Sequence, residues 1–199
     1  MPRTLSESDV AGFRERLCEA AERLFSERGP DAVTMRQLAS ELGVSPMTPY
    51  RYFKDKDDIL AAVRAGAFDR FAEALEAAYA EAGDARARSA RVAEAYLDFA
   101  FAHPQTYKLM FDLHQPNELD YPDLRRAAER ARRTMSGYVG GLIEAGVLAG
   151  DPEEIGAMFW AATHGVVLLA LAGKLDPGAD PRKLASNLSH ALSRGLRPH

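Results

Sequence analysis

The sequence predicts an all-α protein, with a small N-terminal three-helix domain joined to a larger helical domain. Apolar residues recur at three- and four-residue spacing along the chain, the period of an amphipathic helix, and strand patterns are nearly absent. Glycine, proline and capping residues interrupt this period often enough to indicate about nine helices. With 199 residues, 47% of them hydrophobic, the chain is long enough to bury a core.

Three helices are expected before residue 56. The first ends at Gly29-Pro30, and Thr34 is placed to cap the second. Gly43 then suits a left-handed turn, and Ser45 can cap a third helix with Pro46 at its first position. The first helix has one apolar face, made of Phe13, Leu17, Ala20, Ala21, Leu24 and Phe25.

The rest of the chain predicts six more helices. A fourth runs from about Lys56 to Ala82, where Gly83-Asp84 breaks it. The next must end near His103, because Pro104 disfavours helical geometry in the residue before it. The others are expected from there to about Leu113, from Pro122 to about Ala145, from Asp151 to Gly173, and from Asp180 to Gly195.

Residues 155–172 contain no Lys, Arg, Asp or Glu, which raises the question of a membrane span. Thr163, His164 and two glycines lie within the segment, and charged turns bound it closely. We expect instead a helix with one face in its own core and the other against a second copy of the chain. Cys18, the one cysteine, cannot form a disulfide within the chain, and with no signal peptide the expected compartment is the cytoplasm.

Charge is unevenly distributed over the chain, whose net charge is −4. Residues 1–56 hold nine basic and nine acidic residues, so the acidic excess lies entirely in the remainder. Residues 36–56 contain four basic residues and two acidic ones. A local basic surface on an acidic body suits specific DNA binding and disfavours a non-specific nucleic-acid coat.

Residues 34–56 meet the physical requirements of a helix-turn-helix motif. They offer a capped first helix, a glycine turn, a short exposed second helix and donors for phosphates. An ordinary helical corner has the same outline, so the motif alone leaves both interpretations open.

Two sets of residues flank and follow the motif. The first set is Ala20-Ala21-x-x-Leu24-Phe25-x-x-x-Gly29, Thr34-x-x-x-Leu38-Ala39-x-x-Leu42-Gly43-Val44-Ser45 and Thr48-x-Tyr50-x-Tyr52-Phe53-x-x-Lys56, and the second is His103-Pro104-x-x-Tyr107-x-Leu109-Met110-Phe111 and Trp160-x-x-x-His164-Gly165. The first set resembles the N-terminal domain of TetR-family regulators over about residues 10–60. The second set resembles the ligand-binding half of the TetR subgroup named for its Trp-His-Gly signature.

The resemblance implies a homodimer that binds a double-stranded, palindromic DNA operator and pairs through the last two long helices of each chain. It implies a DNA-binding domain over residues 9–56 and a ligand-binding and dimerisation domain over residues 57–199. Carried over by position, phosphate contacts fall on Thr34, Thr48, Tyr50 and Lys56, and possible base contacts on Arg36, Pro46, Met47, Arg51 and Tyr52. Arg36 and Arg51 are the expected guanine contacts, because an arginine fork pairs with O6 and N7 of guanine.

Pro49 departs from the family pattern, in which an aliphatic residue precedes the tyrosine. It lacks an amide donor at about the fourth position of a helix begun at Pro46. Either the recognition helix is distorted, or it begins at Thr48 with Pro49 in its first turn.

A ligand cavity is expected among the C-terminal helices, with an unidentified small-molecule effector. Its candidate residues are aromatic or amphipathic: Phe99, His103, Tyr107, Met110, Phe111, Tyr138, Phe159, Trp160 and His164. For each one, a place in the packed core is the competing interpretation.

The function predicted from these features is that of a sequence-specific transcriptional regulator, a repressor that a small molecule releases from DNA. An activator or a protein-controlled regulator is the alternative within this class, and a helical carrier or enzyme with a vestigial DNA reader is the alternative outside it. No catalytic motif, cofactor motif or metal-ligand spacing is apparent.

Overall fold

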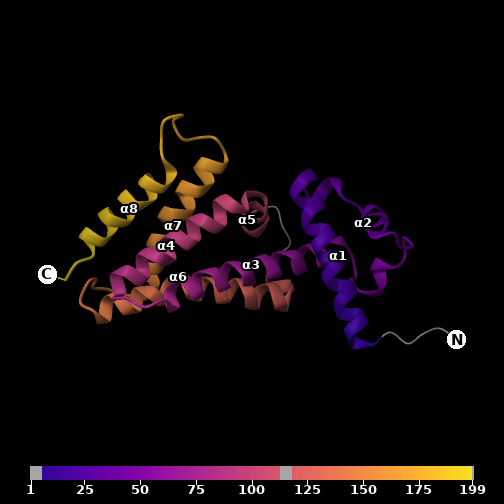
Figure 1. Ribbon diagram of the computed structural model, residues 1–199, viewed down its shortest axis with the longest axis horizontal. Coiled ribbons are helices and arrows are strands. Elements are labelled where there is room, and N and C mark those ends of the chain that lie inside the picture. Colours follow the sequence, from indigo (N-terminus) through magenta and orange to yellow (C-terminus); the bar gives the residue numbers. More distant parts are fainter. Residues whose placement is uncertain (1–5, 113–117, 199) are drawn as a thin grey trace. The chain divides into compact units, whose positions relative to one another are not determined.

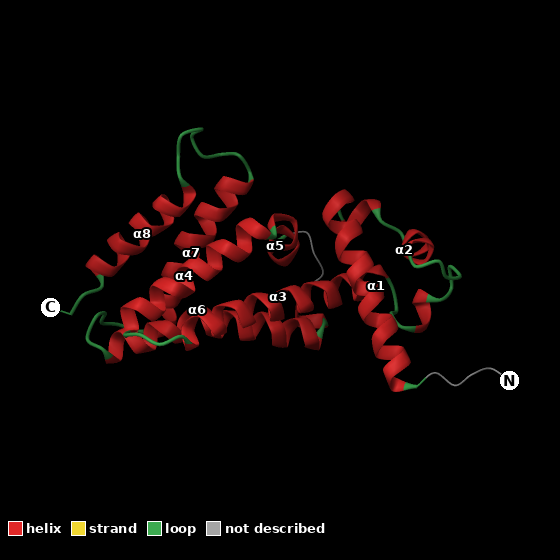
Figure 2. Cartoon of the chain, in the orientation of Figure 1, coloured by secondary structure: helices red, strands yellow, loops and turns green. Residues whose placement is uncertain are grey.

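The computed structural model describes residues 6–112 and 118–198, and every regular element in these ranges is helical (Figures 1 and 2). Eight α-helices and three short 3₁₀ helices follow one another along the chain. In order they are α1 (Glu7–Arg28), η1 (Pro30–Ala32), α2 (Met35–Glu41), η2 (Pro49–Arg51), α3 (Lys56–Ala80), α4 (Ala85–Ala102), α5 (Pro104–Phe111), η3 (Glu118–Asp120), α6 (Pro122–Glu144), α7 (Pro152–Leu171) and α8 (Pro181–Gly195). The predicted all-α class is therefore confirmed.

Capping chemistry sets most of these boundaries. The Thr34 hydroxyl accepts the amide of Gln37, and the Gln37 side chain accepts the amide of Thr34, which closes a capping box on α2. Asp151 accepts the amides of Glu153 and Glu154 at the start of α7, and Asp180 caps α8 in the same way. Gly43 has φ +66°, the left-handed conformation expected for the residue that leads out of α2.

The expected third helix is absent as an α-helix, so the prediction of about nine helices is corrected to eight among the residues described. The amide of Thr48 bonds the carbonyl of Ser45 at 2.8 Å in a turn, and helical backbone begins only at Thr48. Pro49 occupies the first position of the 3₁₀ helix η2. Because Pro49 has no N–H, it cannot extend a helix that starts at Pro46.

The helices pack into two units that cover different parts of the chain. The first unit holds the chain up to Phe68 together with Gln105–Ala128, and the second holds Asp69–Pro104 with the chain from Glu129 onward. Helices α3 and α6 each cross from one unit to the other. The predicted domain boundary after residue 56 concerns function rather than packing, and it stays a prediction.

The first unit has a core formed by α1, α2, the segment after η2, the start of α3, and α5. Leu17, Leu38 and Ile59 are fully buried there, and Leu109 of α5 belongs to the same cluster. Phe53 is buried in this cluster, and Val44 packs against it while remaining half-buried. Cys18 also lies against this cluster, and burial raises the pKa of its thiol to about 11.

Polar contacts fix α5 to this unit. Arg64, buried on α3, donates to the carbonyl of Met110 at 3.1 Å and lies 3.5 Å from a carboxylate oxygen of Glu118. The Thr106 hydroxyl donates to Glu22 of α1 at 2.9 Å.

The second unit packs α4, α6, α7 and α8 with the C-terminal part of α3. Val139, Leu148, Ile155 and Phe159 form part of its core. Arg130 of α6 forms ion pairs with three carboxylates on the C-terminal part of α3. Its guanidinium nitrogens lie 3.2 Å from Asp69, 3.6 Å from Glu73 and 2.5 Å from Glu76.

Helix α7 is the one described helix whose length and composition would let it cross a membrane, and 28% of its apolar window is buried within the chain. A core helix of a globular domain passes the same test. The expectation that one face of α7 lies in its own core is met by Ile155, Phe159 and Val166. Met158, Leu168 and Leu169 of the same helix are exposed.

Candidate functional site

The first candidate site is the surface formed by α2, the following turn and η2. It presents two large side chains to solvent, Met47 at 68% and Tyr50 at 49% exposure. Thr34, Arg36, Pro46 and Arg51 are also exposed. These side chains are therefore accessible to another molecule.

Three residues of the predicted DNA-binding set are half-buried instead. The Tyr52 ring stacks on Phe13 with centroids 4.3 Å apart, and Arg14 donates to the carbonyl of Tyr52. Lys56 donates to the carbonyl of Pro30 at 2.7 Å, which ties the start of α3 to η1. Thr48 is the N-cap residue that directly precedes η2.

The acidic groups near this surface are engaged in local contacts. Glu41 forms an ion pair with Arg23 of α1, and Asp55 accepts the amide of Asp58 at 2.9 Å. Within the two described ranges, Arg36, Arg51 and Lys54 have no ion-pair partner. The charges of Arg36, Arg51 and Lys54 are therefore available to phosphates.

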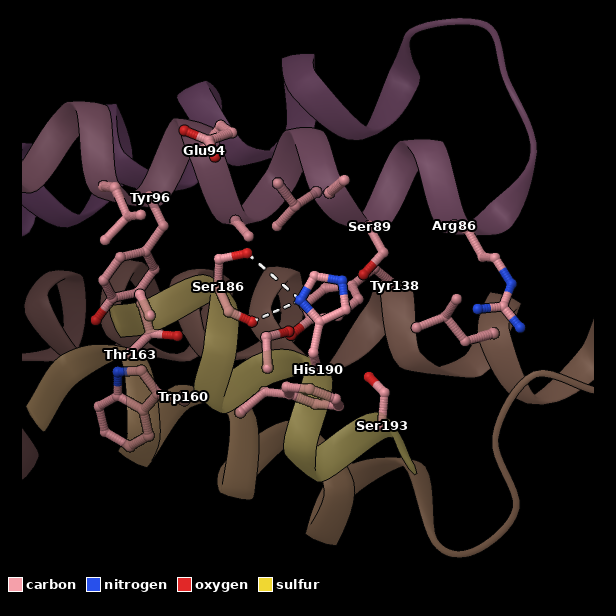
Figure 3. Close-up of a pocket in the computed structure, with 18 of the residues that line it drawn as sticks. Arg86, Ser89, Glu94, Tyr96, Tyr138, Trp160, Thr163, Ser186, His190 and Ser193 are labelled. Atoms are coloured by element: carbon pink, nitrogen blue, oxygen red, sulfur yellow. Dashed lines mark hydrogen bonds between the residues drawn. The ribbon is translucent and has the colours of Figure 1, made fainter. Parts of the chain in front are cut away.

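The second candidate site is a cavity of about 310 Å³ within the second unit, between α4, α6, α7 and α8 (Figure 3). Its volume is at the lower end of the range for small-molecule pockets. Trp160, Tyr96 and Thr163 lie toward one end, and Arg86, Ser89 and Ser193 lie toward the other (Figure 3).

The nine residues predicted to bind the ligand fall into three groups. Tyr138, Phe159 and Trp160 line the cavity. Phe99, His103 and His164 belong to the same unit but do not line it. Tyr107, Met110 and Phe111 belong to the first unit, where Tyr107 and Met110 are buried.

Pro104 explains why the predicted set divides. It begins α5 directly after α4 ends at Ala102, and α5 packs into the first unit. His103 and Tyr107 are close in sequence, yet they belong to different units. The ligand-binding roles of the six residues outside the cavity stay predictions.

Sequence reasoning missed the contribution of α8 to the cavity. Ser186, Ser189, His190 and Ser193 line it from one helical face, and Tyr96 lines it from α4. The spacing of three and four residues among the α8 residues indicates one polar helical face, and this pattern is visible in the sequence. It was overlooked because Leu184, Leu188 and Leu192 define a more obvious stripe on the same helix.

Burial perturbs two groups around the cavity. It raises the pKa of the Tyr138 phenol above the usual range of tyrosine, so this group stays protonated and can donate a hydrogen bond. It lowers the pKa of His164, whose Nδ1 lies 3.5 Å from the hydroxyl of Tyr96.

We expect His164 to make folding stability sensitive to mild acid. Because its pKa is lower in the folded state, the unfolded chain takes up a proton first as the pH falls below about 6.5. The free energy of unfolding should therefore fall as the pH drops from 7 to 5. In His164→Gln this fall should be smaller, and thermal melts at several pH values measure it. Equal acid sensitivity in both proteins would contradict the assignment.

Comparisons with known proteins agree with both halves of the chain. Residues 17–63 match the family described as bacterial regulatory proteins, tetR family, and residues 89–192 match the family described as tetracyclin repressor-like, C-terminal domain. The chain belongs to the TetR family. It is a DNA-binding transcriptional regulator with a helix-turn-helix N-terminal region, as the sequence predicted.

Individual relatives cover most of this TetR-family chain. A protein of unknown function from Rhodococcus sp. RHA1 is 34% identical, with a TM-score of 0.81 over 93% of this chain and 95% of that one. An uncharacterized HTH-type transcriptional regulator of Mycobacterium tuberculosis is 29% identical over 82% of this chain and 72% of its own length. A TetR family transcription regulator from Marinobacter aquaeolei VT8 shares the fold, with a TM-score of 0.71, 18% identity, and 98% and 100% of the two chains covered.

Proposed function

We propose that this TetR-family regulator is a cytoplasmic repressor that binds a palindromic operator as a homodimer and is released by a small molecule. The observation that carries the proposal is the distribution of exposed large apolar side chains over the described residues. Of the seven such side chains, Met47 and Tyr50 lie on the candidate DNA surface, four lie on the last two helices, and Leu119 lies in η3. These two surfaces match the two partners that the proposal requires.

The proposed dimer interface uses the outer faces of α7 and α8. Met158, Leu168 and Leu169 on α7 and Leu188 on α8 are between 37% and 46% exposed. Gly165 falls on the same helical face as Met158 and Leu169, and a Cβ atom added there would meet nothing within 4 Å. This face therefore leaves room for the close approach of a helix from a second copy.

The proposed DNA contacts follow from exposure and charge. Arg36 and Arg51 would contact bases together with Pro46, Met47 and Tyr52, and Thr34, Thr48, Tyr50 and Lys56 would hold phosphates. The two copies of this surface in the dimer would bind two operator half-sites about 34–36 Å apart. The segment that enters the major groove would be short, because η2 is a single 3₁₀ turn. It would present few side chains to the bases, mainly those between Pro46 and Tyr52.

Release from DNA requires a ligand that binds the DNA-incompetent arrangement better, since only a difference in affinity shifts the population. The proposed ligand site is the cavity between α4, α6, α7 and α8. Helices α3 and α6 each contain residues of both units. They therefore connect the unit that holds the cavity with the unit that holds the candidate DNA surface.

DNA binding is tested by selecting operators from random DNA with the wild-type protein and measuring affinity at fixed salt. We expect Tyr50→Ala to weaken binding roughly a hundredfold, because a hydrogen bond to a charged phosphate is removed from each half-site. Tyr50→Phe, which removes only the hydroxyl, should lose nearly as much. Both variants should melt like the wild type. Failure to select any sequence, or full affinity in Tyr50→Ala, would reject the proposal.

The dimer is tested by introducing a charge into its proposed interface. We expect Leu169→Glu to reduce the mass in solution from that of a dimer to the 21.8 kDa of one chain, because burying an unpaired carboxylate costs several kcal/mol. Leu119→Glu is the matched control, since Leu119 is 68% exposed and lies outside α7 and α8. Light scattering after size exclusion measures the mass. A dimer that persists in Leu169→Glu would place the interface elsewhere.

A further inference from the structure

The cavity in the second unit is electrically asymmetric. Four arginines line it, but they differ in their partners. Arg182 is paired with Glu94 at 3.1 Å and Asp98 at 2.6 Å, so its charge is compensated. Arg86, Arg194 and Arg197 form no ion pair with any residue in the ranges that the structure describes.

The three uncompensated arginines gather at one end of the cavity. Helices α4 and α8 run antiparallel, because Arg182 near the start of α8 reaches Glu94 and Asp98 in the second half of α4. The start of α4, with Arg86, therefore lies by the end of α8. Figure 3 places Arg86, Ser89 and Ser193 toward this end, and Arg194 directly follows Ser193.

Aromatic side chains lie toward the opposite end of the cavity, beside the Arg182–Glu94 ion pair. Trp160 of α7 and Tyr96 of α4 line this end (Figure 3), and Tyr96 is buried. These surfaces favour a hydrocarbon or aromatic group, because its transfer from water is favourable and its contacts are mainly dispersive.

Polar groups that can donate hydrogen bonds lie between the two ends. Ser186 lines this stretch, and His190 lies beside it (Figure 3). The Nδ1 atom of His190 is 2.8 Å from the carbonyl oxygen of Ser186, so Nδ1 carries a proton and donates it there. The remaining His190 nitrogen, Nε2, is left for other contacts.

We propose that the effector of this repressor is an organic acid: a carboxylate head joined to an apolar aryl or alkyl body. The head lies among Arg86, Arg194 and Arg197, and the body lies against Trp160 and Tyr96. Arginine forks bind carboxylates with paired, charge-assisted hydrogen bonds, whereas a neutral or cationic head would leave these groups unmatched. The inference rests on the proposed function, since it names the ligand class of that same cavity.

The charge of the rest of the molecule makes this asymmetry informative. The chain as a whole is acidic, with 29 Asp and Glu residues against 25 Lys and Arg. Among the lining residues, however, Glu94 is the single carboxylate, and it is paired with Arg182. Arg86, Arg194 and Arg197 are exposed, so they form a positive rim at one end of the cavity, and this rim favours a ligand of opposite charge.

The test compares matched ligands that differ only in the charge of the head. The probes are 4-phenylbutyrate, 4-phenylbutanamide and 4-phenylbutylamine, and octanoate, octanamide and octylamine. Trp160 is the only tryptophan of the chain and lines the cavity, so its fluorescence, excited where these probes do not absorb, reports their binding to the full-length protein. We expect each carboxylate to bind at least about tenfold more tightly than its amide and the amines to bind most weakly.

Substitution of the cations identifies the source of this preference. In the double variant Arg86→Gln, Arg194→Gln, the carboxylates should bind with no more than about threefold preference over the amides, while amide affinity stays the same. Lys183→Gln is the matched control, because Lys183 is an exposed cation on α8 that does not line the cavity. It should keep the full preference.

Three results would overturn the inference: amides that bind as tightly as carboxylates, no saturable signal with either carboxylate, or a preference that survives in the double variant. Operator affinity and dimer mass are measured separately on the same wild-type protein. If those two hold and the charge preference fails, the ligand class is wrong and the repressor proposal stands. If operator binding fails while the preference holds, the repressor proposal alone is rejected.

Discussion

Gly156→Val is expected to reduce the free energy of unfolding by about 3 kcal/mol, because a side chain at this position has no room. Gly156 is buried on α7 where it crosses α6. A Cβ atom added there would lie 2.8 Å from the Cα and 2.8 Å from the Cβ of Ser136. The Cα cannot rotate away, so the two helices must separate to accept valine.

The destabilisation should appear as a fall in the melting temperature of about 6–12 °C, given the size of this chain. Helix separation should also disturb the cavity, because Met135 next to Ser136 and Trp160 one turn after Gly156 both line it. A shift in tryptophan fluorescence should accompany the lower melting temperature.

Gly137→Val is the matched control for this prediction. Gly137 lies on α6 one residue from Ser136, is exposed, and would place its Cβ within 4 Å of nothing. The same substitution should change stability there by no more than about 0.5 kcal/mol. If both variants melted at the same temperature, the destabilisation would come from helix propensity or β-branching and not from the crossing of α6 and α7.

The sequence predicted the helix boundaries well where a capping side chain acts on its own neighbours. Asp151 and Asp180 each accept amides two and three residues ahead, so the start of α7 and of α8 depends on no distant contact. Thr34 and Gly43 bound α2 for the same local reason. The Pro49 conflict was likewise visible in the sequence, but its outcome was not. Whether a turn, a 3₁₀ helix or a distorted α-helix forms depends on how the surrounding core holds Pro49, which is buried.

The cavity was harder to predict because helical periodicity does not distinguish a core from a pocket. Tyr107 and Phe159 both recur at core spacing and are both buried, yet only Phe159 lines the cavity. The difference arises from Pro104, which sends α5 into the first unit, and from the placement of α8 beside α4. Both are long-range facts. The polar face of α8 at Ser186, Ser189 and Ser193 gains its meaning only once α4 and α7 are opposite it.

Arg51→Ala is expected to weaken operator binding by about 2–6 kcal/mol, roughly 30-fold to 10⁴-fold. An arginine that contacts guanine through both arms of its guanidinium fork contributes about 1–3 kcal/mol of discrimination. In the proposed dimer, two such arginines contact each operator. Arg51 ends η2, is exposed, and has no ion-pair partner in the part of the chain that the structure describes. Its removal should therefore not affect folding. Affinity is measured by fluorescence anisotropy on the selected operator and on each single-base variant of one half-site.

The loss of affinity alone does not distinguish a base contact of Arg51 from a phosphate contact. The affinities for the single-base variants of the operator distinguish the two. A base contact predicts that Arg51→Ala binds all four bases equally at one position of the half-site, with an unchanged slope of affinity against salt. A phosphate contact predicts uniform weakening on every sequence and a salt slope smaller by about one for each phosphate that the variant no longer neutralises. Arg125→Ala, an exposed arginine on α6, is the control for the change in net charge alone. Uniform weakening in Arg51→Ala would reassign base reading to Arg36, because it would place Arg51 beside Tyr50 among the groups that hold the backbone.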